Sequence, residues 1–109
     1  MTVTTKFTFL DGASAATTGK EMANPNGENL TVSVSGTFTG SIKFQGYLNG
    51  AWYDLNGVKL DDLEVYATIT AAGAYIVAGI EGFEKIRANL TAITSGSVTA
   101  VGRLTRTVA

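Results

Sequence analysis

The sequence lacks cysteine and histidine altogether and contains a single proline. Without cysteine there is neither a disulfide framework nor a thiolate metal site. Without histidine, the commonest metal ligand and the commonest general base are both absent. A nucleophilic triad fails for want of that base, and neither a G-x-S-x-G elbow nor a phosphate-binding glycine loop occurs. We therefore expect no catalytic residue, no bound metal and no cofactor.

Charge is also scarce, since eight Lys and Arg stand against nine Asp and Glu and charged residues make up 16% of the chain. This balance gives no electrostatic footprint for a nucleic-acid backbone, so no nucleic-acid partner is expected. The apolar runs fall far short of the roughly 20 residues that span a bilayer. The stretch from Met1 to Lys6 lacks the basic and apolar regions of a secretory signal. We expect synthesis in a host cytoplasm, without secretion and without a membrane partner.

Period-two alternation of apolar and polar residues is the dominant pattern of the chain, and it is typical of β-strands. Its clearest instance places Leu30, Val32 and Val34 on one face, with Thr and Ser on the other. Similar patterns predict further strands at residues 3–9, 41–48, 52–55, 65–70, 75–78, 86–92 and 98–104. Residues 13–27 are expected to form a loop or a short edge strand near Lys20 to Met22. Residues 58–64 fit either a single helical turn or a loop.

The length of the chain fits one domain spanning residues 1–109, and the hydrophobic share of 45% is enough for a core. About seven or eight short strands separated by turn signals, with no long 3.6-residue period, predict an all-β fold. We expect an antiparallel β-sandwich, either jelly-roll-like or immunoglobulin-like.

Turn-forming residues separate the predicted strands. Asn49-Gly50 is the strongest signal, because a type I′ hairpin turn needs positive φ at both central residues. It predicts a hairpin that joins the strand ending near Leu48 to the strand containing Trp52. Other breaks are expected at Asp11-Gly12, Gly19, Pro25, Gly27, the glycine-rich stretch 36–40, Asn56-Gly57, Ser95-Gly96 and Gly102.

One acidic cluster is present, formed by Asp54, Asp61, Asp62 and Glu64. Carboxylates suit hard cations such as calcium, but the spacing lacks the alternating ligands, the turn glycine and the closing Glu of an EF-hand loop. Paired carboxylates could also serve glycoside hydrolysis, which needs a cleft that a domain of this size rarely builds. A solvated charged loop is the simpler interpretation, and no metal ligand is assigned.

Aromatic residues are the main candidates for a ligand surface, because aromatic faces stack on sugar rings. Five could contribute: Tyr47, Trp52, Tyr53, Tyr66 and Tyr75. Tyr47 and Tyr53 are expected to be exposed, whereas Trp52 fits a core position beneath the hairpin turn. Burial in a core or a subunit interface and stacking on a ligand are the two alternatives. The candidate interface or ligand surface consists of Tyr47, Asn49, Trp52 and Tyr53.

Two segments carry a pattern of turn and core residues. In the first, a Val-x-Val-x-Gly strand is followed by a Thr-rich turn, a strand, a hairpin and a Trp, with the matching residues Val32, Val34, Gly36, Gly40, Phe44, Asn49, Gly50, Trp52 and Leu55. In the second, a Gly-aromatic-x-x-hydrophobic-Arg strand leads into a turn and a Val-rich strand, with the matching residues Gly82, Phe83, Ile86, Arg87, Thr94, Ser95, Gly96, Ser97 and Val98.

These segments resemble small β-sandwich proteins encoded among the structural genes of tailed bacteriophages and prophages. The sequence departs from that pattern at Asn49, where Asp is usual, at Tyr47, where a small residue is common, and in having one residue fewer before Trp52. These departures tighten the hairpin.

The resemblance implies a non-enzymatic virion protein, located on the particle and bound to capsid or other virion proteins. Head decoration as a homo-oligomer, with a trimer favoured, is the first expectation. The alternative is a carbohydrate-binding or host-adhesion module of a tail or fibre. Scarce charge gives little mutual repulsion, which also favours self-association. The N-terminal strand or the tail from Gly102 to Ala109 could add a strand to a neighbour's sheet edge.

Overall fold

The computed structural model describes residues 1–24 and 27–107, which form ten β-strands and no helix. The predicted break at Pro25 and the last two residues of the predicted C-terminal tail, Val108 and Ala109, lie outside the described residues. In the described part of the chain no helix is long and apolar enough to cross a membrane.

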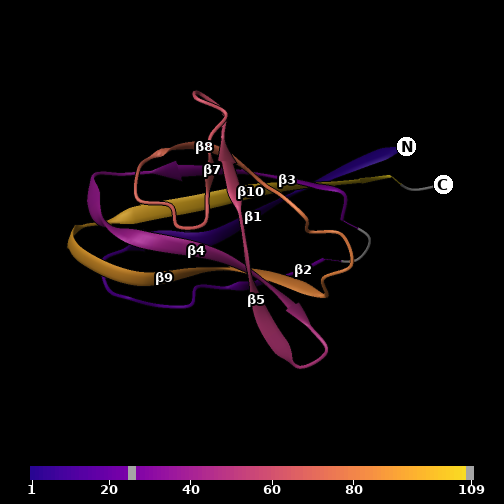
Figure 1. Ribbon diagram of the computed structural model, residues 1–109, viewed down its shortest axis with the longest axis horizontal. Helices are drawn as coiled ribbons and strands as arrows, with labels where there is room; N and C mark the ends of the chain where they lie inside the picture. Colours follow the sequence, from indigo (N-terminus) through magenta and orange to yellow (C-terminus); the bar gives the residue numbers. More distant parts are fainter. Residues whose placement is uncertain (25–26, 108–109) are drawn as a thin grey trace.

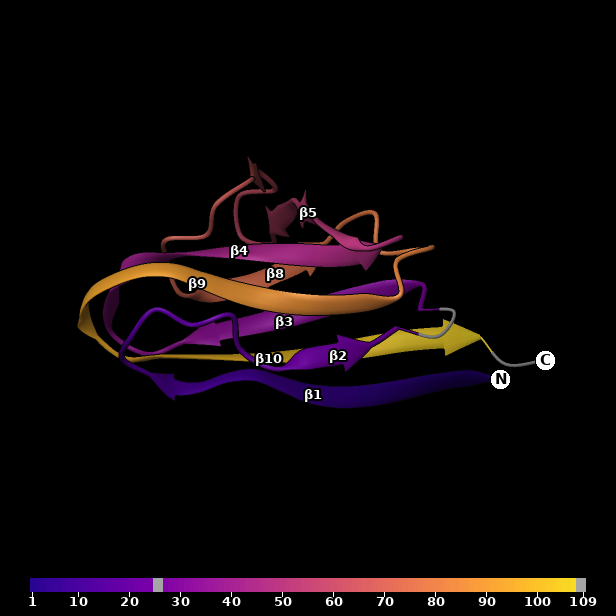
Figure 2. The ribbon, with the colours of Figure 1, turned by 90° about the horizontal axis from the view of Figure 1, so that it is seen from below.

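The strands form two antiparallel sheets packed face to face, which confirms the predicted all-β sandwich (Figures 1 and 2). The six-stranded sheet has the order β1-β10-β3-β8-β6-β7. Its strands are β1 (Thr2–Ala13), β10 (Val98–Thr107), β3 (Asn29–Ser35), β8 (Gly73–Val77), β6 (Gly57–Lys59) and β7 (Val65–Tyr66). The four-stranded sheet has the order β2-β9-β4-β5. Its strands are β2 (Glu21–Ala23), β9 (Lys85–Gly96), β4 (Phe38–Leu48) and β5 (Ala51–Leu55).

The core lies between the two sheets and is built by the alternation that the sequence shows. In β3 every second residue is buried, as the pattern predicts. The largest fully buried side chains come from both sheets and the loops: Tyr75, Phe9, Phe44, Leu30, Ile42, Ile69, Ile80, Ile86, Leu90, Val32, Val77 and Val98. Each buried aliphatic or aromatic side chain contributes about 1.5–3 kcal/mol relative to an exposed one, so this layer holds the sheets together.

Gly102 does not break the last strand, contrary to the prediction, because β10 runs through it without interruption. The space that a side chain would occupy there is filled by the ring of Phe9, whose Cε2 lies 2.6 Å from the position of an added Cβ. The Phe9 ring in turn meets the Phe44 ring of the other sheet edge-on, with centroids 5.5 Å apart. The glycine therefore makes room for an aromatic contact between the sheets.

Three other predicted breaks are wrong in detail, and one of them is Ser95-Gly96, since both residues still belong to β9. β1 continues past Asp11-Gly12 to Ala13, through irregularities in its pairing with β10 that absorb the extra residues. β4 already begins at Phe38, so only the first two residues of the stretch 36–40 lie outside a strand. The edge strand expected near Lys20 to Met22 is present as β2.

The chain changes sheets at Asn56, between β5 and β6. The segment 58–64 contains the end of β6 and a turn rather than a helix. The strand predicted at 65–70 is reduced to β7, with Ile69 forming a single bridge to Ile42. The β6–β7 hairpin projects from the sandwich (Figure 1).

The two ends of the described chain lie side by side, because Thr2 of β1 pairs with Thr107 of β10. β10 is also paired with β3 on its other side, so it is an inner strand. Residues 102–105 of the predicted tail therefore pair on both sides and have no free edge to offer a neighbour. Arg106 and Thr107 pair with β1, so the expectation of a contact from the tail stays a prediction. β1 does lie at a sheet edge, as the alternative requires.

Candidate binding face

The outward side of the four-stranded sheet carries the largest group of aromatic and charged side chains. β4 pairs with β5 and with β9, so their outward residues stand in adjacent rows. We call this group the aromatic face, and it consists of Lys43, Gln45, Tyr47, Trp52, Asp54, Lys85 and Arg87.

A tight hairpin turn sets the geometry of this face. Asn49 and Gly50 have φ angles of 48° and 88°, the positive pair that a type I′ turn requires. The Asn49 N–H also donates to Glu84 Oε2 at 3.0 Å, which ties the turn to the loop before β9. The predicted hairpin is confirmed, and it places Tyr47 directly opposite Trp52. The centroids of those two rings are 5.1 Å apart, with planes tilted by 58°.

Trp52 is not the core residue that its place beside the turn suggested. Counting in steps of two from buried Leu55 puts Tyr53 on the inward side of β5 and Trp52 on the outward side. There the Trp52 ring is half-buried beneath Arg87, whose guanidinium carbon lies 4.0 Å from the ring centroid. This cation–π contact covers the indole with a charged group of the same chain.

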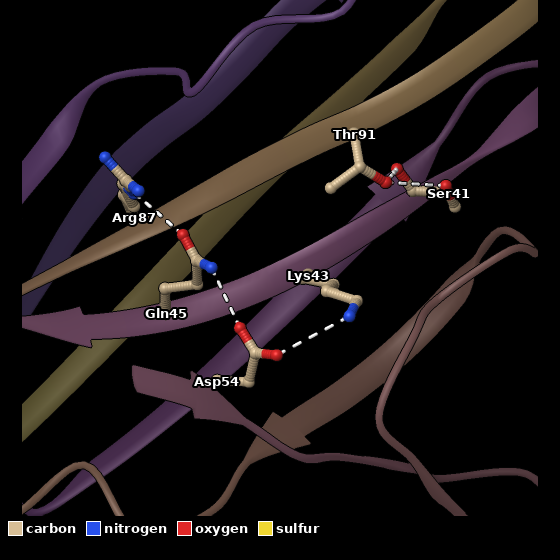
Figure 3. A network of polar contacts seen from close by, with 6 residues as sticks. All are labelled: Ser41, Lys43, Gln45, Asp54, Arg87 and Thr91. Atoms are coloured by element: carbon tan, nitrogen blue, oxygen red, sulfur yellow. Dashed lines mark hydrogen bonds and ion pairs between the residues drawn. The ribbon is translucent and has the colours of Figure 1, made fainter. Parts of the chain in front are cut away.

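Arg87 is held from a second direction by a chain of polar contacts (Figure 3). Its Nε donates to Gln45 Oε1 at 2.9 Å, and Gln45 Nε2 donates to Asp54 Oδ1 at 2.8 Å. Lys43 Nζ lies 3.5 Å from Asp54 Oδ2 and closes the chain. The guanidinium is therefore fixed in plane and position before any partner arrives, with its terminal nitrogens pointing away from Gln45 (Figure 3).

The carboxyl group of Asp54 stays ionised in this arrangement. The hydrogen bond from Gln45 lowers its pKa, desolvation opposes that change, and the charge of Lys43 lowers the pKa further. Next to these polar contacts, the hydroxyls of Ser41 and Thr91 share a hydrogen bond of 2.7 Å across β4 and β9. The face is thus a continuous polar surface with one aromatic pair at its hairpin end.

The other predicted surface residues lie elsewhere. Tyr53 is 53% exposed but belongs to the opposite side of the sheet, where its ring lies 6.3 Å from that of Phe83. Asn49 sits in the turn between β4 and β5, next to the aromatic face but not part of it. Tyr75, one of the five aromatic candidates, is buried, and its hydroxyl donates to the Ala71 carbonyl at 2.7 Å.

The predicted surface left out five members of the face: Lys43, Gln45, Asp54, Lys85 and Arg87. Arg87 lies between Ile86 and Ala88, which are buried, so the alternation of β9 already placed it outward. What the alternation lacked was the pairing of β9 with β4, which puts Arg87 opposite Gln45 and next to the hairpin.

The acidic cluster divides between two places. Asp54 belongs to the aromatic face, while Asp61, Asp62 and Glu64 lie in the β6–β7 hairpin. Asp62 accepts from the Glu64 N–H at 2.9 Å and from the Tyr66 hydroxyl at 2.8 Å, and these bonds lower its pKa. Across residues 1–24 and 27–107, no three acidic side chains come together in a way that could hold a metal ion.

Two depressions in the described part of the chain lie away from the aromatic face. One of about 220 Å³ lies on the outer side of the six-stranded sheet, beside Ala74 and Val101. The other, of about 390 Å³, is lined by residues that include Glu28 and Glu81. The residues of the aromatic face stand in adjacent rows on β5, β4 and β9, an arrangement that suits an extended partner surface.

These observations define an all-β protein whose two antiparallel sheets pack as a sandwich, with aromatic and charged residues on the outer side of one sheet. Within that class, the chain belongs to the XepA family, whose model matches residues 3–104. No curated protein matches the chain.

Two solved structures share the fold. The prophage-derived protein YomS of SPBc2 is 27% identical, with a TM-score of 0.87, over 96% of this chain and 95% of that protein. The PBSX exported protein XepA is also 27% identical, with a TM-score of 0.89, over 95% of this chain. The chain spans only 38% of that longer protein. The predicted resemblance to phage and prophage proteins is confirmed at this level.

Proposed function

We propose that this chain is a non-enzymatic accessory structural protein of a phage or prophage particle, most directly a capsid-decorating homo-oligomer. The observation that carries the proposal is the aromatic face. Trp, Tyr and Arg are the residues that most often dominate the binding energy of protein interfaces. Here Trp52, Tyr47 and Arg87 form one cluster, held by contacts within the chain. A surface ordered in advance loses less conformational freedom on binding.

Other features support the same role. The sequence has no histidine or cysteine for catalysis. Symmetric assembly, with a trimer as the first expectation, would let several modest contacts act together on a shell that repeats the same site. The proposed location is the virion after synthesis in the host cytoplasm. One relative is described as exported, so fractionation of induced cells should separate particle-bound protein from protein released without particles.

A binding experiment tests the proposal. Purified protein is added to heads that lack it, and co-sedimentation is measured for the wild type and for Trp52→Ala. We expect the substitution to weaken binding by about 30-fold, since central anchors contribute about 2 kcal/mol or more. Tyr53→Ala is the matched control, because Tyr53 is exposed on the other side of the sheet. Failure of the wild type to bind heads or other purified virion parts would end the proposal.

A host-adhesion module is the second candidate, favoured by the Tyr47–Trp52 pair. Aromatic pairs of this kind can receive sugar rings, but Arg87 already covers one face of the indole. A sugar would therefore have to displace the guanidinium or stack on Tyr47. Titration with host wall glycans, followed by the fluorescence of Trp52, measures this directly. An unchanged spectrum together with an empty glycan array would exclude it.

A further inference from the structure

Arg87 carries the one positive charge of the aromatic face that no carboxylate in the described part of the chain neutralises. Lys43 is paired with Asp54, and Lys85 is paired with Glu21 at 3.4 Å. No described carboxylate lies within ion-pair distance of Arg87. The register of β4 and β9 places Arg87 between the levels of Lys43 and Lys85. The unmatched charge therefore stands at a single position, between two cations whose charges are already matched.

Two carboxylates stand on strands near Arg87, and both bind other groups. Glu21 of β2 occupies the position directly opposite Arg87, yet its Oε1 lies 3.4 Å from Lys85 Nζ. Asp54 is separated from Arg87 by Gln45, whose carbonyl oxygen accepts from Arg87 and whose amide donates to Asp54. A neutral amide thus takes the place that a carboxylate could occupy at Nε. The guanidinium is held in position while its charge is left unpaired.

Most of the hydrogen-bond donors of Arg87 are free. An arginine side chain has one N–H at Nε and four at its two terminal nitrogens. In the described part of the chain only Nε has a hydrogen-bond partner, the carbonyl oxygen of Gln45. The Trp52 ring lies against one face of the guanidinium, with its centroid 4.0 Å from the central carbon. The terminal nitrogens point away from Gln45 and form an open edge of a fixed, planar group (Figure 3).

This open edge fits a planar anion with two acceptor oxygens. A carboxylate binds the edge of a guanidinium through two parallel hydrogen bonds, which are stronger and more directional than bonds to a neutral acceptor. The rings of Trp52 and Tyr47 lie beside the edge, with centroids 5.1 Å apart. Apolar rings next to a charged pair exclude water when a partner covers them, and this strengthens the attraction between the charges.

We propose that Arg87 receives the carboxylate of an acidic side chain on the virion protein that the aromatic face contacts. The carboxylate would accept two hydrogen bonds from the terminal nitrogens, and the methylene groups that carry it would pack against Trp52 and Tyr47. This inference rests on the proposed function and names the chemistry of the partner, a surface Asp or Glu at the centre of the contact. One carboxylate suffices, because the charges of Lys43 and Lys85 are matched within the chain.

Co-sedimentation with heads that lack the protein tests the role of Arg87. Arg87→Gln removes the charge and the paired donors, so we expect binding to weaken by about 30-fold or more, because the partner's carboxylate loses its counter-charge. Arg87→Lys keeps the charge without the planar fork, and we expect a loss of about tenfold.

The matched control is Lys43→Gln, which removes one positive charge from the same face. Because Lys43 is already paired with Asp54 on an exposed surface, we expect its binding to change by less than about threefold. Far-ultraviolet circular dichroism shows whether each variant keeps the β-fold. Arg87→Lys provides the measurement if Arg87→Gln does not fold.

A change on the partner tests the carboxylate itself. Heads are treated with a water-soluble carbodiimide and glycinamide, which converts exposed carboxylates to neutral amides, and wild-type binding to them is measured. We expect a loss as large as that of Arg87→Gln, whereas heads treated with glycinamide alone should bind normally. In a complex of untreated heads with the Arg87→Lys variant, carbodiimide alone should join the introduced lysine to the carboxylate that faces it. Mass spectrometry of the digested product then identifies that acidic residue.

The outcomes separate this inference from the proposed function. A wild type that binds neither heads nor other purified virion parts overturns both. A wild type that binds, with Arg87→Gln binding equally well, overturns the inference and leaves the proposed function standing. Equal losses for Arg87→Gln and Lys43→Gln would show a general attraction between opposite charges, and they overturn the specific pairing. Unchanged wild-type binding to intact amidated heads overturns the partner carboxylate.

Discussion

The outer sides of the two sheets are built from the same period-two alternation, yet their outward side chains differ in length and in whether they bind one another. On the four-stranded sheet, the outward residues are long and bind one another, as Arg87, Gln45 and Asp54 do. On the six-stranded sheet, the outward residues are mostly short, and the cations Lys6 and Arg103 stand unpaired among the described residues. The outward side chains of the four-stranded sheet thus hold one another in place, whereas Lys6 and Arg103 have no such contact. The difference agrees with the proposal that the outer side of the four-stranded sheet contacts a partner.

The largest effect is expected from a substitution in the core that joins the two sheets. Phe9→Ala removes a fully buried ring that meets Phe44 across the core. We expect a loss of about 3–5 kcal/mol in the free energy of unfolding. This is a large share of the total free energy of unfolding of a small domain. Urea unfolding followed by Trp52 fluorescence and by circular dichroism measures it. Transitions that separate for the two probes would show that the sheets do not unfold as one unit.

A smaller effect is expected from Arg87→Lys on the aromatic face. Lysine keeps the charge but loses the planar stack on Trp52 and the Nε donor to Gln45. We expect binding to the virion partner to weaken by about 1–2 kcal/mol, with less than about 1 kcal/mol lost from stability. Binding and urea unfolding of the same preparation measure the two quantities. Equal losses in both would assign Arg87 to the fold rather than to the face.

On the other side, Leu63→Gly is expected to leave stability unchanged or raise it. Leu63 has a φ of 57°, in the left-handed region that glycine adopts most readily. Relief of this backbone strain should gain about 1–2 kcal/mol, and the greater freedom of glycine in the unfolded chain should cost about 0.5–1 kcal/mol. The net gain is therefore about 0–1.5 kcal/mol. Thermal unfolding at a concentration where the wild type is monomeric measures it. A clear loss would mean that the Leu63 side chain supports the hairpin itself.

The smallest effect is expected from lowering the pH, and it involves Asp54 on the aromatic face and Asp62 in the β6–β7 hairpin. Hydrogen bonds lower the pKa of Asp54 and of Asp62 below the ordinary value of 3.8. A lowered pKa in the folded state stabilises the protein above the unfolded value, and this contribution is lost as pH falls below 3.8 and through the folded pKa. Carboxyl chemical shifts followed by NMR from pH 6 downward should show that both carboxyl groups have titration midpoints below 3.8. In Gln45→Ala the pKa of Asp54 should rise while that of Asp62 stays unchanged.

Local patterns predicted much of the fold and part of the face. The alternation of β3 and the Asn49-Gly50 hairpin were predictable because each depends on neighbours in sequence. Counting in steps of two from Leu55 would also have placed Trp52 outward. The core position predicted for Trp52 is wrong because the period of two, and not nearness to a turn, decides which side of a strand a residue occupies.

Other features depend on contacts between distant segments. The break predicted at Gly102 is wrong because the sequence does not show that Phe9 fills the space beside this residue. The covering of Trp52 by Arg87 requires β9 to pair with β4, and sequence alternation does not specify which strands pair. The depression beside Ala74 and Val101 likewise requires β1, β10, β3 and β8 to lie in that order. The φ of Leu63 is set by a turn that closes against Lys59, in a residue type that would not be chosen for it.

The pairing of Thr2 with Thr107 has a practical meaning for how this sandwich can be joined to other polypeptides. Segments joined at Thr2 and at Thr107 would therefore leave the six-stranded sheet at one place, beside the start of β1. The unit can thus be inserted into another chain, or fused at its terminus, without opening a strand pair. Evolution can attach such a unit to new partners by simple fusion, and a fluorescent or affinity tag can be placed there for the binding assays.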